Sequence, residues 1–448
     1  MELILKNILK VVDATIKVDG ITVIAGSNNM GKSTAGKALL TAISAFADMD
    51  QFIEKQRILN LRKELVKLGD ALDLFCKKNT NIVRKKTGKI NSTIDLYIPR
   101  ILEEESGEAV QKDIDLFIRD ICGLYGLNID YINSESFDAA MLAYSNIMES
   151  FELDDDEIGY RHVTDEFRKT FGDSVVNFNA SAGSIIVEEN GAAAGLTFTR
   201  DKKDYCSEII REYPMKYNAL SVGEPDVLNL FGSLAASRAV KFSKKKLLRG
   251  LLQMDRYKSL WEAYEEDGPD KSIIDEINLE RKFSQALEKV QQVLNGYVVY
   301  DSNGLNFVEN GLEGKIPVEN MSTGLKSMVL LEQVIKLGLL TDNTVWGLDE
   351  PEIHLHPEWQ IRYAEIIVLL QKYVGLKVVI ATHSPYFLKA ILYFSRKYEV
   401  IQNANFYTTV NTNGGVCFED VTNKVDSVFK QLTVPLFEIM EDTEFNDL

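Results

Sequence analysis

The chain has 448 residues, of which 45% are hydrophobic and 26% are charged, values typical of a soluble globular protein and not of a disordered or fibrous one. Its 67 acidic and 50 basic residues give a formal net charge of −17, which argues against a surface that binds nucleic acid as a whole. There is no uninterrupted apolar run of about 18 residues and no secretion signal, so we expect a cytoplasmic protein that does not enter a membrane. The four widely spaced cysteines include no C-x-x-C pair, which predicts ordinary buried thiols: Cys76, Cys122, Cys206 and Cys417.

The first informative pattern is the stretch GSNNMGKST at residues 26–34, which lies between an apolar strand at 21–25 and a helix-favouring segment at 35–40. It matches G-x-x-x-x-G-K-[ST], in which backbone N–H groups and a helix N-terminus surround phosphate oxygens. We expect Lys32 to reach the β- and γ-phosphates and the Ser33 hydroxyl to hold Mg²⁺. The alternative is that this segment is only a tight turn before a helix and binds no ligand. The predicted nucleotide-binding residues are Gly26, Ser27, Asn28, Asn29, Gly31, Lys32, Ser33 and Thr34.

The middle of the chain has a different character. Apolar residues recur at helical spacing between residues 52 and 75, and more helix is expected up to about residue 171. Residues 93–98 are interpreted as a strand, and 184–187 with 196–198 as a β-hairpin around Asn190-Gly191. A mixed helical stretch follows from about 227 to 294. Two groups of cations could bind DNA or simply form solvated faces: Arg84, Lys85, Lys86 and Lys89, and Lys241, Lys244, Lys245, Lys246 and Arg249.

After residue 296 strands and helices alternate, which predicts a core of mixed α/β class that a long insertion divides. We assign residues 1–47 to the N-terminal part of this core and 296–436 to its C-terminal part. Residues 48–295 form the inserted, mainly helical lobe with a β-hairpin. Residues 437–448 are expected to be a frayed acidic tail.

Two further motifs follow in this second part of the core. An apolar strand at 344–348 ends in Asp349 and Glu350, the pattern called Walker B. Asp349 is expected to bind Mg²⁺, and Glu350 to act as a general base on the attacking water. A second apolar strand at 377–382 ends in His383, which we expect near the γ-phosphate and the water.

Three of the four histidines lie close together in the sequence, at His354, His356 and His383. With Asp349 and Glu350 as oxygen ligands they raise the alternative of a metal site. Pro357 follows directly, so His354 and His356 precede a helix and do not stack on it, which favours packing and capping roles.

Ahead of these two strands in the C-terminal core part, Ser322 is a good N-cap for a helix that begins in MSTGLKS at residues 321–327. This segment, LDEPEIHLHPEWQ at 348–360 and VVIATHSP at 378–385 together resemble the signature, Walker B plus D-loop, and switch-histidine segments of ABC-type ATPases. The resemblance is to the soluble branch of AAA family ATPases with the overcoming-lysogenisation-defect and RecF/SMC-like proteins. It covers about residues 1–46 and 297–434.

The resemblance implies an ABC-type P-loop ATPase head, a mixed sheet flanked by helices, with a long and mostly helical insertion. It also implies ATP and Mg²⁺ as ligands and a head-to-tail homodimer or higher oligomer. Ser322 and Gly324 would contact the γ-phosphate bound by the partner subunit. The family's Q-loop glutamine has two candidates, Gln51 and Gln56, which both lie in a helical pattern.

The chain also departs from this family. It has no sustained heptads or zinc hook, and residues 384–448 contain no D-x-D motif of the kind a nuclease module needs. By analogy with the family we expect an ATPase that senses or regulates a separately encoded effector in bacterial anti-phage defence. One alternative is a DNA-repair or recombination ATPase that grips DNA through the inserted lobe. Another is a nucleotide-binding scaffold without turnover.

Overall fold

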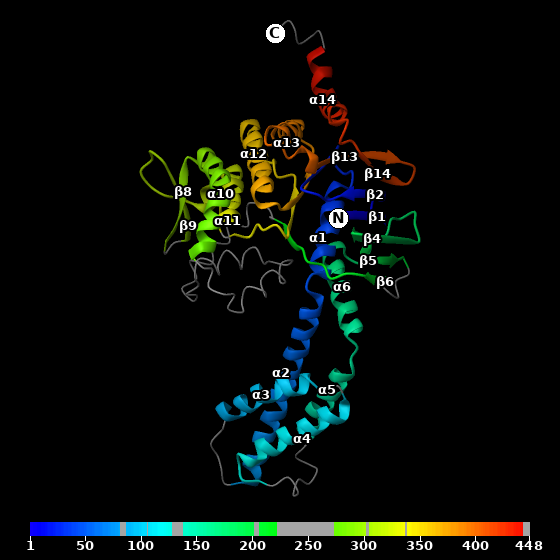
Figure 1. Cartoon of the computed structure of the whole chain (residues 1–448), viewed down its shortest axis with the longest axis vertical. Helices are drawn as coiled ribbons and strands as arrows, with labels where there is room; N and C mark the ends of the chain where they lie inside the picture. The colour runs from blue at the N-terminus through cyan, green and yellow to red at the C-terminus, as the bar shows by residue number, and fades with distance from the viewer. Residues whose placement is uncertain are drawn as a thin grey trace. The chain divides into compact units, whose positions relative to one another are not determined.

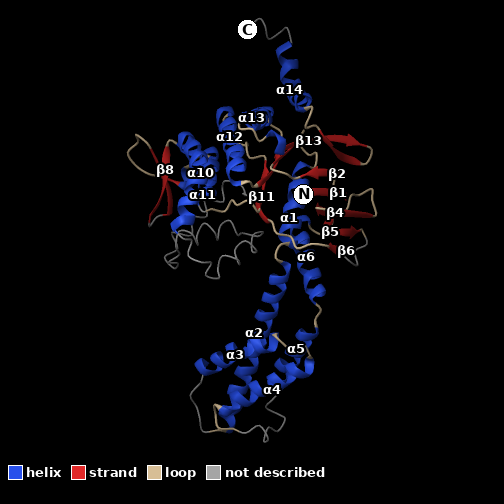
Figure 2. Cartoon of the chain, in the orientation of Figure 1, coloured by secondary structure: helices blue, strands red, loops and turns tan. Residues whose placement is uncertain are grey.

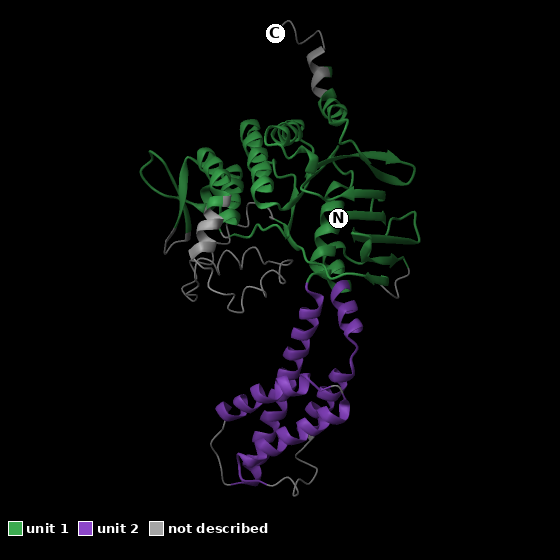
Figure 3. Ribbon diagram, viewed as in Figure 1, with its two compact units in different colours: residues 1–47, 164–448 green, residues 48–163 purple. Residues whose placement is uncertain are grey.

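The computed structural model describes residues 1–80, 87–104, 106–127, 138–200, 206–221, 273–301, 304–336 and 338–441. These residues divide into two compact units, shown in Figure 3. Unit 1 comprises residues 1–47 and 164–448, and unit 2 comprises residues 48–163.

Unit 1 is built on one large mixed sheet, in which eleven strands of the described chain follow the order β6-β5-β4-β1-β2-β14-β13-β3-β12-β11-β7 (Figure 2). The strands are β1 (Glu2–Ile8), β2 (Val11–Lys17), β3 (Ile21–Ala25), β4 (Ala182–Glu189), β5 (Ala192–Thr199), β6 (Cys206–Arg211), β7 (Asn218–Ser221), β11 (Thr344–Asp349), β12 (Lys377–Thr382), β13 (Ala404–Thr412) and β14 (Gly415–Asp420). A smaller antiparallel sheet contains β8 (Gly296–Asp301), β9 (Gly304–Glu309) and β10 (Ile316–Pro317).

The centre of the large sheet is parallel and buried. β13, β3, β12, β11 and β7 run in one direction, and every residue of β3 is buried, as expected for strands covered on both faces. Ala25 pairs with Thr382, and Asp349 pairs with Ala381. The carboxyl ends of β3, β12 and β11 therefore meet at one edge, where ligands bind in open α/β sheets.

Unit 1 also contains helices (Figure 1). They are α1 (Lys32–Phe46), α10 (Ile273–Leu294), α11 (Thr323–Lys336), α12 (Pro357–Val374), α13 (Pro385–Lys397) and α14 (Val425–Glu441), together with the short 3₁₀ helices η4 (Val318–Asn320) and η5 (Ile401–Asn403). Of these, α1 contacts the large sheet, α10 packs on α11 and α12, and α14 extends away from the sheet. α12 packs against both α10 and α13. Trp346 of β11 is fully buried in the shared apolar core, which holds the strand ends in place.

The predicted β-hairpin is confirmed. β4 and β5 pair antiparallel from Ala182 with Thr199 to Glu189 with Ala192, so Asn190 and Gly191 form a two-residue turn. Their φ angles are 54° and 82°, the left-handed values that such a turn requires.

Unit 2 is helical in its described residues. It contains α2 (Met49–Asn79), α3 (Thr87–Leu102), α4 (Gly107–Gly123), α5 (Asp138–Glu152) and most of α6 (Asp155–Phe171). Buried residues of α2, α3, α4 and α5 form its apolar core. The core contains Cys76 and Cys122, whose Sγ atoms are 3.8 Å apart as free thiols. Cys206 is also buried, whereas Cys417 is partly exposed, so the prediction of buried thiols is wrong for Cys417.

The strand predicted at residues 93–98 is wrong, because these residues belong to α3. The buried residues Ile90, Ile94, Tyr97 and Ile101 recur at intervals of three and four, which is the period of a helix. The six-residue segment alone suggested a strand because it is rich in β-branched and aromatic side chains.

Two domain boundaries also differ from the prediction. The insertion was expected to end at residue 295, but from residue 164 the chain belongs to unit 1, since it supplies β4–β7 to the large sheet. The tail was expected to fray from residue 437, but α14 continues to Glu441, where helix-forming residues extend it.

Some predictions fall on residues outside the described part of the chain. These are the cations Arg84, Lys85 and Lys86, the cluster at 241–249, most of the helical stretch at 227–294, and residues 442–448. None of the described helices is long and apolar enough to cross a membrane.

Candidate functional site

The loop after β3 is shaped to surround an anion. Gly31, at the N-cap of α1, has a left-handed φ of 74°, and Asn29 has a φ of 63°. Because glycine has no side chain, the first N–H groups of α1 are not capped by it and face the loop at the positive end of the helix dipole. The ammonium of Lys32 donates a hydrogen bond to the Ser27 carbonyl at 2.8 Å, so the side chain curls over the loop.

Both glycines of the motif are also required by close packing. A Cβ atom on Gly31 would lie 2.8 Å from Cγ2 of Val11, in addition to its unfavourable φ. A Cβ atom on Gly26 would lie 2.3 Å from Oγ1 of Thr409. The loop therefore keeps its backbone close to β2 and β13, which only glycine permits at these two positions.

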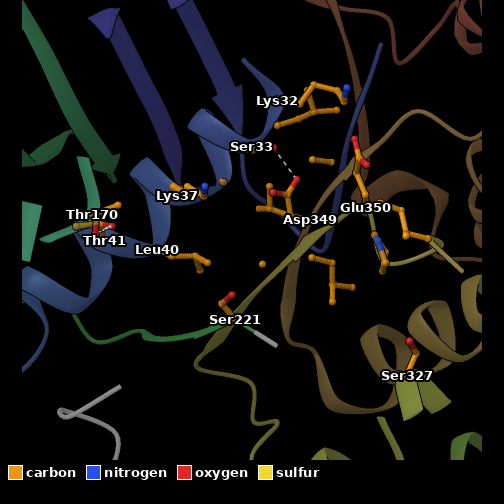
Figure 4. A pocket seen from close by; sticks show the side chains of 18 of the residues that line it. Lys32, Ser33, Lys37, Leu40, Thr41, Thr170, Ser221, Ser327, Asp349 and Glu350 are labelled. Carbon is orange, nitrogen blue, oxygen red and sulfur yellow. Dashed lines mark hydrogen bonds between the residues drawn. The ribbon is translucent and has the colours of Figure 1, made fainter. Parts of the chain in front are cut away.

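A serine and a carboxylate that are 316 residues apart in sequence meet at this edge. The Ser33 hydroxyl donates to Oδ1 of Asp349 at 2.8 Å (Figure 4). Ser33 lies in the first turn of α1 and Asp349 ends β11, and the parallel pairing of β11, β12 and β3 brings them together. Paired hydroxyl and carboxylate oxygens next to an anion loop suit Mg²⁺ bound to phosphates.

Lys32 lies in the same place with its charge largely removed from water. Its side chain is only 4% exposed. Burial lowers the pKa of Lys32, against the opposing effect of the carboxylates of Glu350 and Asp349, which favour the charged form. Because nearby carboxylates neutralise this buried ammonium only in part, binding of an additional anion beside it would be favourable.

Glu350 and His383 approach each other beside this group. Oε1 of Glu350 lies 3.2 Å from Nδ1 of His383. Glu350 has a φ of 48°, uncommon for a residue with a side chain, and its backbone N–H donates to the Ala381 carbonyl at 2.8 Å. This bond to the neighbouring strand end holds the strained residue at the edge of the sheet, and strained residues of this kind gather at active sites.

Lys32, Ser33, Asp349 and Glu350 line a cavity of about 680 Å³, the size of a small-molecule site, whereas His383 lines a separate pocket with Glu352 and Ser384. Figure 4 shows Lys32, Ser33, Asp349 and Glu350 around it. Ser327 of α11 lines the same cavity. This cavity therefore brings Lys32 together with the predicted metal-binding residues Ser33 and Asp349 and the predicted base Glu350, whereas residues 26–31 of the phosphate loop do not line it.

The signature segment lies close to the turn that follows β11. Ser322 caps α11, since its Oγ accepts a hydrogen bond from the Leu325 N–H at 3.3 Å, and its side chain is exposed. A Cβ atom on Gly324 would lie 2.9 Å from the carbonyl oxygen of His354, which explains the glycine. The contact of Ser322 and Gly324 with a phosphate held by a second subunit stays a prediction.

The other candidates are placed as follows. The described residues hold no group of three His, Cys, Asp or Glu side chains arranged to bind a metal ion. Nδ1 of His356 accepts a hydrogen bond from the Glu358 N–H at 3.4 Å and so caps α12. Gln51 and Gln56 lie on α2 of unit 2, and the Q-loop assignment stays open.

One buried residue of the site had no predicted role. Glu352 is 2% exposed, and its Oε1 accepts a hydrogen bond from the Thr382 hydroxyl. Burial raises the pKa of Glu352. A signal was available in the sequence, because Glu352 is a charged residue in the run DEPEIHL between two apolar segments, close to the proposed base.

The fold and this edge of the sheet define a P-loop nucleotide-binding protein with an ABC-type ATPase head. Residues 21–389 match the model of a family described as AAA domain, putative AbiEii toxin, Type IV TA system. The match covers most of the chain, so the chain belongs to this family, and the predicted resemblance and fold class are confirmed. No curated protein sequence matches the chain.

Solved structures of SMC heads are similar at low identity. An SmcHead bound to the C-winged helix domain of ScpA is 11% identical with a TM-score of 0.42, over 95% of this chain and 98% of that chain. The SMC head domain from Thermotoga maritima is 13% identical with a TM-score of 0.35, over 94% and 98%. The Smc head from Pyrococcus furiosus bound to the C-terminal domain of ScpA is 12% identical with a TM-score of 0.39, over 98% and 99%.

Proposed function

We propose that this protein binds ATP with Mg²⁺ and hydrolyses it to ADP and phosphate. The observation that carries the proposal is the 2.8 Å contact between Ser33 and Asp349, beside the buried ammonium of Lys32. These residues would hold the metal ion and the β- and γ-phosphates. The metal ion, when bound, neutralises charge on the phosphate oxygens.

The chain's own groups supply the rest of the chemistry. The N–H groups at the start of α1 and the Lys32 ammonium orient the phosphates. Glu350 accepts a proton from the attacking water at its carboxylate. His383, whose Nδ1 lies 3.2 Å from Oε1 of Glu350, is placed beside that carboxylate and contacts the γ-phosphate. The roles of Ser322 and Gly324 require a second copy of the chain across the site.

Phosphate release in the steady state tests the enzymatic part. Wild-type protein should release phosphate from Mg·ATP. Glu350→Gln keeps the shape of the base and the metal site, so it should still bind ATP while turnover falls by about 10² to 10⁴. Normal hydrolysis by Glu350→Gln in a single-turnover assay would show that the general base is misassigned. If the wild-type protein released no phosphate, the protein would be a nucleotide-binding scaffold without turnover.

A mixing experiment tests the composite site. Ser322→Arg places bulk at the exposed start of α11 and should block hydrolysis, while the isolated subunit still binds ATP. Lys32→Ala removes the phosphate cation of the other half-site. Mixed dimers contain one interfacial site intact on both sides and should recover part of the activity. An absence of recovery in mixed dimers that are shown to form would argue against catalysis across subunits.

We further propose that ATP-driven dimerisation regulates a separately encoded effector in anti-phage defence. The family description, which names a putative toxin of a type IV toxin–antitoxin system, supports a role in a system of that kind. Unit 2 also exposes several large apolar side chains on helices α2, α3 and α5, which are candidates for contact with a partner: Leu59, Leu74, Leu96, Met141 and Leu142. Replacing Leu142 and Leu96 by Glu should abolish the biological output and leave ATP turnover within about threefold.

A further inference from the structure

The segments that carry Glu350 and His383 are joined by side-chain hydrogen bonds. The Thr382 hydroxyl donates to Oε1 of Glu352. The same hydroxyl oxygen accepts a hydrogen bond from the backbone N–H of Ser384 at 3.0 Å. Thr382 and Ser384 are the two neighbours of His383, so this contact connects both of them to the segment after Glu350.

A second bond lies on the other side of the histidine. The Ser384 hydroxyl donates to Oε1 of Gln360 at 2.7 Å. Nε2 of Gln360 donates to the Leu355 carbonyl at 3.0 Å, and the Leu355 N–H donates to the Glu352 carbonyl at 3.0 Å. The two segments therefore form a closed ring of hydrogen bonds through Glu352, Thr382, Ser384, Gln360 and Leu355.

Four residues of this ring are buried, and Gln360 is partly exposed. Thr382 is fully buried, Ser384 is 7% exposed and Glu352 is 2% exposed. Oε2 of Glu352 makes no hydrogen bond in the described part of the chain, so Thr382 supplies the only side-chain partner of this carboxylate there. A buried carboxyl with one oxygen left without a hydrogen bond and a single side-chain partner is costly to keep, which points to a role in the site beyond the stability of the fold.

We propose that Glu352 and Thr382 are positioning residues, whose hydrogen bond holds His383 at the distance from Glu350 that hydrolysis requires. The inference rests on the proposed ATPase function. In this proposal the hydrogen bond between Glu352 and Thr382 positions His383, and the charge of Glu352 does not. The amide oxygen of glutamine can accept the same bond, whereas an apolar side chain cannot.

Two variants of Thr382 distinguish the contribution of its hydroxyl from that of its side-chain shape. Thr382→Val keeps the β-branched volume and removes the donor, and Thr382→Ser keeps the donor. Thr382→Val should lower kcat by about 10- to 100-fold, because displacement of a catalytic group by about 1 Å costs this much. The KM for ATP should stay within about threefold, since the phosphate loop is untouched. Thr382→Ser and Glu352→Gln should retain most of the wild-type kcat.

A spectroscopic readout makes the test independent of turnover. The chain has four histidines, so ring ¹³Cε1 labelling gives four resonances, and His383→Gln assigns one of them. Thr382→Val should shift the His383 resonance and leave those of His162 and His356 in place. Thr382→Ser should reproduce the wild-type spectrum. A purely structural effect would instead lower the melting temperature and disturb all four signals.

The outcomes separate the inference from the proposed function. If Thr382→Val leaves both kcat and the His383 resonance unchanged, the positioning role is wrong. If wild type releases no phosphate, the ATPase proposal fails, and the histidine spectrum still decides whether the bond places His383. Should Thr382→Val not fold, Glu352→Met removes the acceptor at similar volume and without a buried charge, and the same two readouts apply.

Discussion

Replacing Lys32 by methionine removes a buried charge and retains the length of the side chain. In the nucleotide-free protein the pKa of Lys32 is lowered by burial more than the carboxylates of Glu350 and Asp349 raise it. The folded state therefore disfavours the ammonium, and this penalty is present at neutral pH and is relieved only as the pH rises through the lowered pKa. Ser27 is exposed, so water can replace the lost hydrogen bond to its carbonyl.

The expected effects on stability and on binding consequently have opposite signs. Without nucleotide, Lys32→Met should unfold with an unchanged free energy or with one that is higher by about 1 kcal/mol. With ATP it loses a hydrogen bond between charged groups, worth about 1.5 to 3 kcal/mol. The Kd for Mg·ATP should therefore rise about 10- to 150-fold.

Thermal denaturation without nucleotide and calorimetric titration with Mg·ATP measure the two effects. Lys37→Met is the matched control, because Lys37 is an exposed cation of α1 that lines the same cavity. It should leave Kd within about threefold, as expected for a solvated charge. A fall of several degrees in the melting temperature of Lys32→Met with an unchanged Kd would refute the reasoning, since Lys32 would then be a structural counter-ion.

Three other predictions concern stability, measured by urea or thermal unfolding. Because burial raises the pKa of Glu352 above its ordinary 4.5, ionisation destabilises the fold as the pH rises; Glu352→Gln should be more stable than wild type at pH 8, and equal stability there would contradict this. Gly31→Ala should lower the free energy of unfolding by about 1 to 3 kcal/mol, because the φ of Gly31 is 74°. Gly36 lies at an open position inside α1, so Gly36→Ala should raise the free energy of unfolding by up to about 1 kcal/mol. Similar values for the two variants would contradict the special backbone role of Gly31. Burial raises the pKa of Glu365, but the Tyr398 hydroxyl and nearby cations outweigh it, so the pKa is lowered. Glu365→Gln should therefore lower the free energy of unfolding by about 1 to 2 kcal/mol at pH 7. This difference from wild type should vanish as the pH falls below about 4.

Local motifs carried most of the correct predictions. The Asn190-Gly191 hairpin and the Ser322 cap each depend on one to four residues whose backbone preferences hold in any context. The helix at 87–102 was missed over residues 93–98, because six residues rich in Ile, Thr and Tyr fit a strand as well as a helix. The packing of unit 2 decided in favour of the helix, which buries Ile94 and Tyr97 together.

The amino-acid sequence by itself predicted which residues would carry the chemistry, since GSNNMGKST and the Asp349-Glu350 pair each indicate a local conformation and a set of functional groups. Only the tertiary structure decided that Ser33 meets Asp349 at 2.8 Å and that Glu352 lies buried beside Thr382. Those contacts depend on β3 lying between β13 and β12, with β11 next to β12. Strand order is set by the burial of side chains from segments hundreds of residues apart, and no short stretch of sequence contains that information.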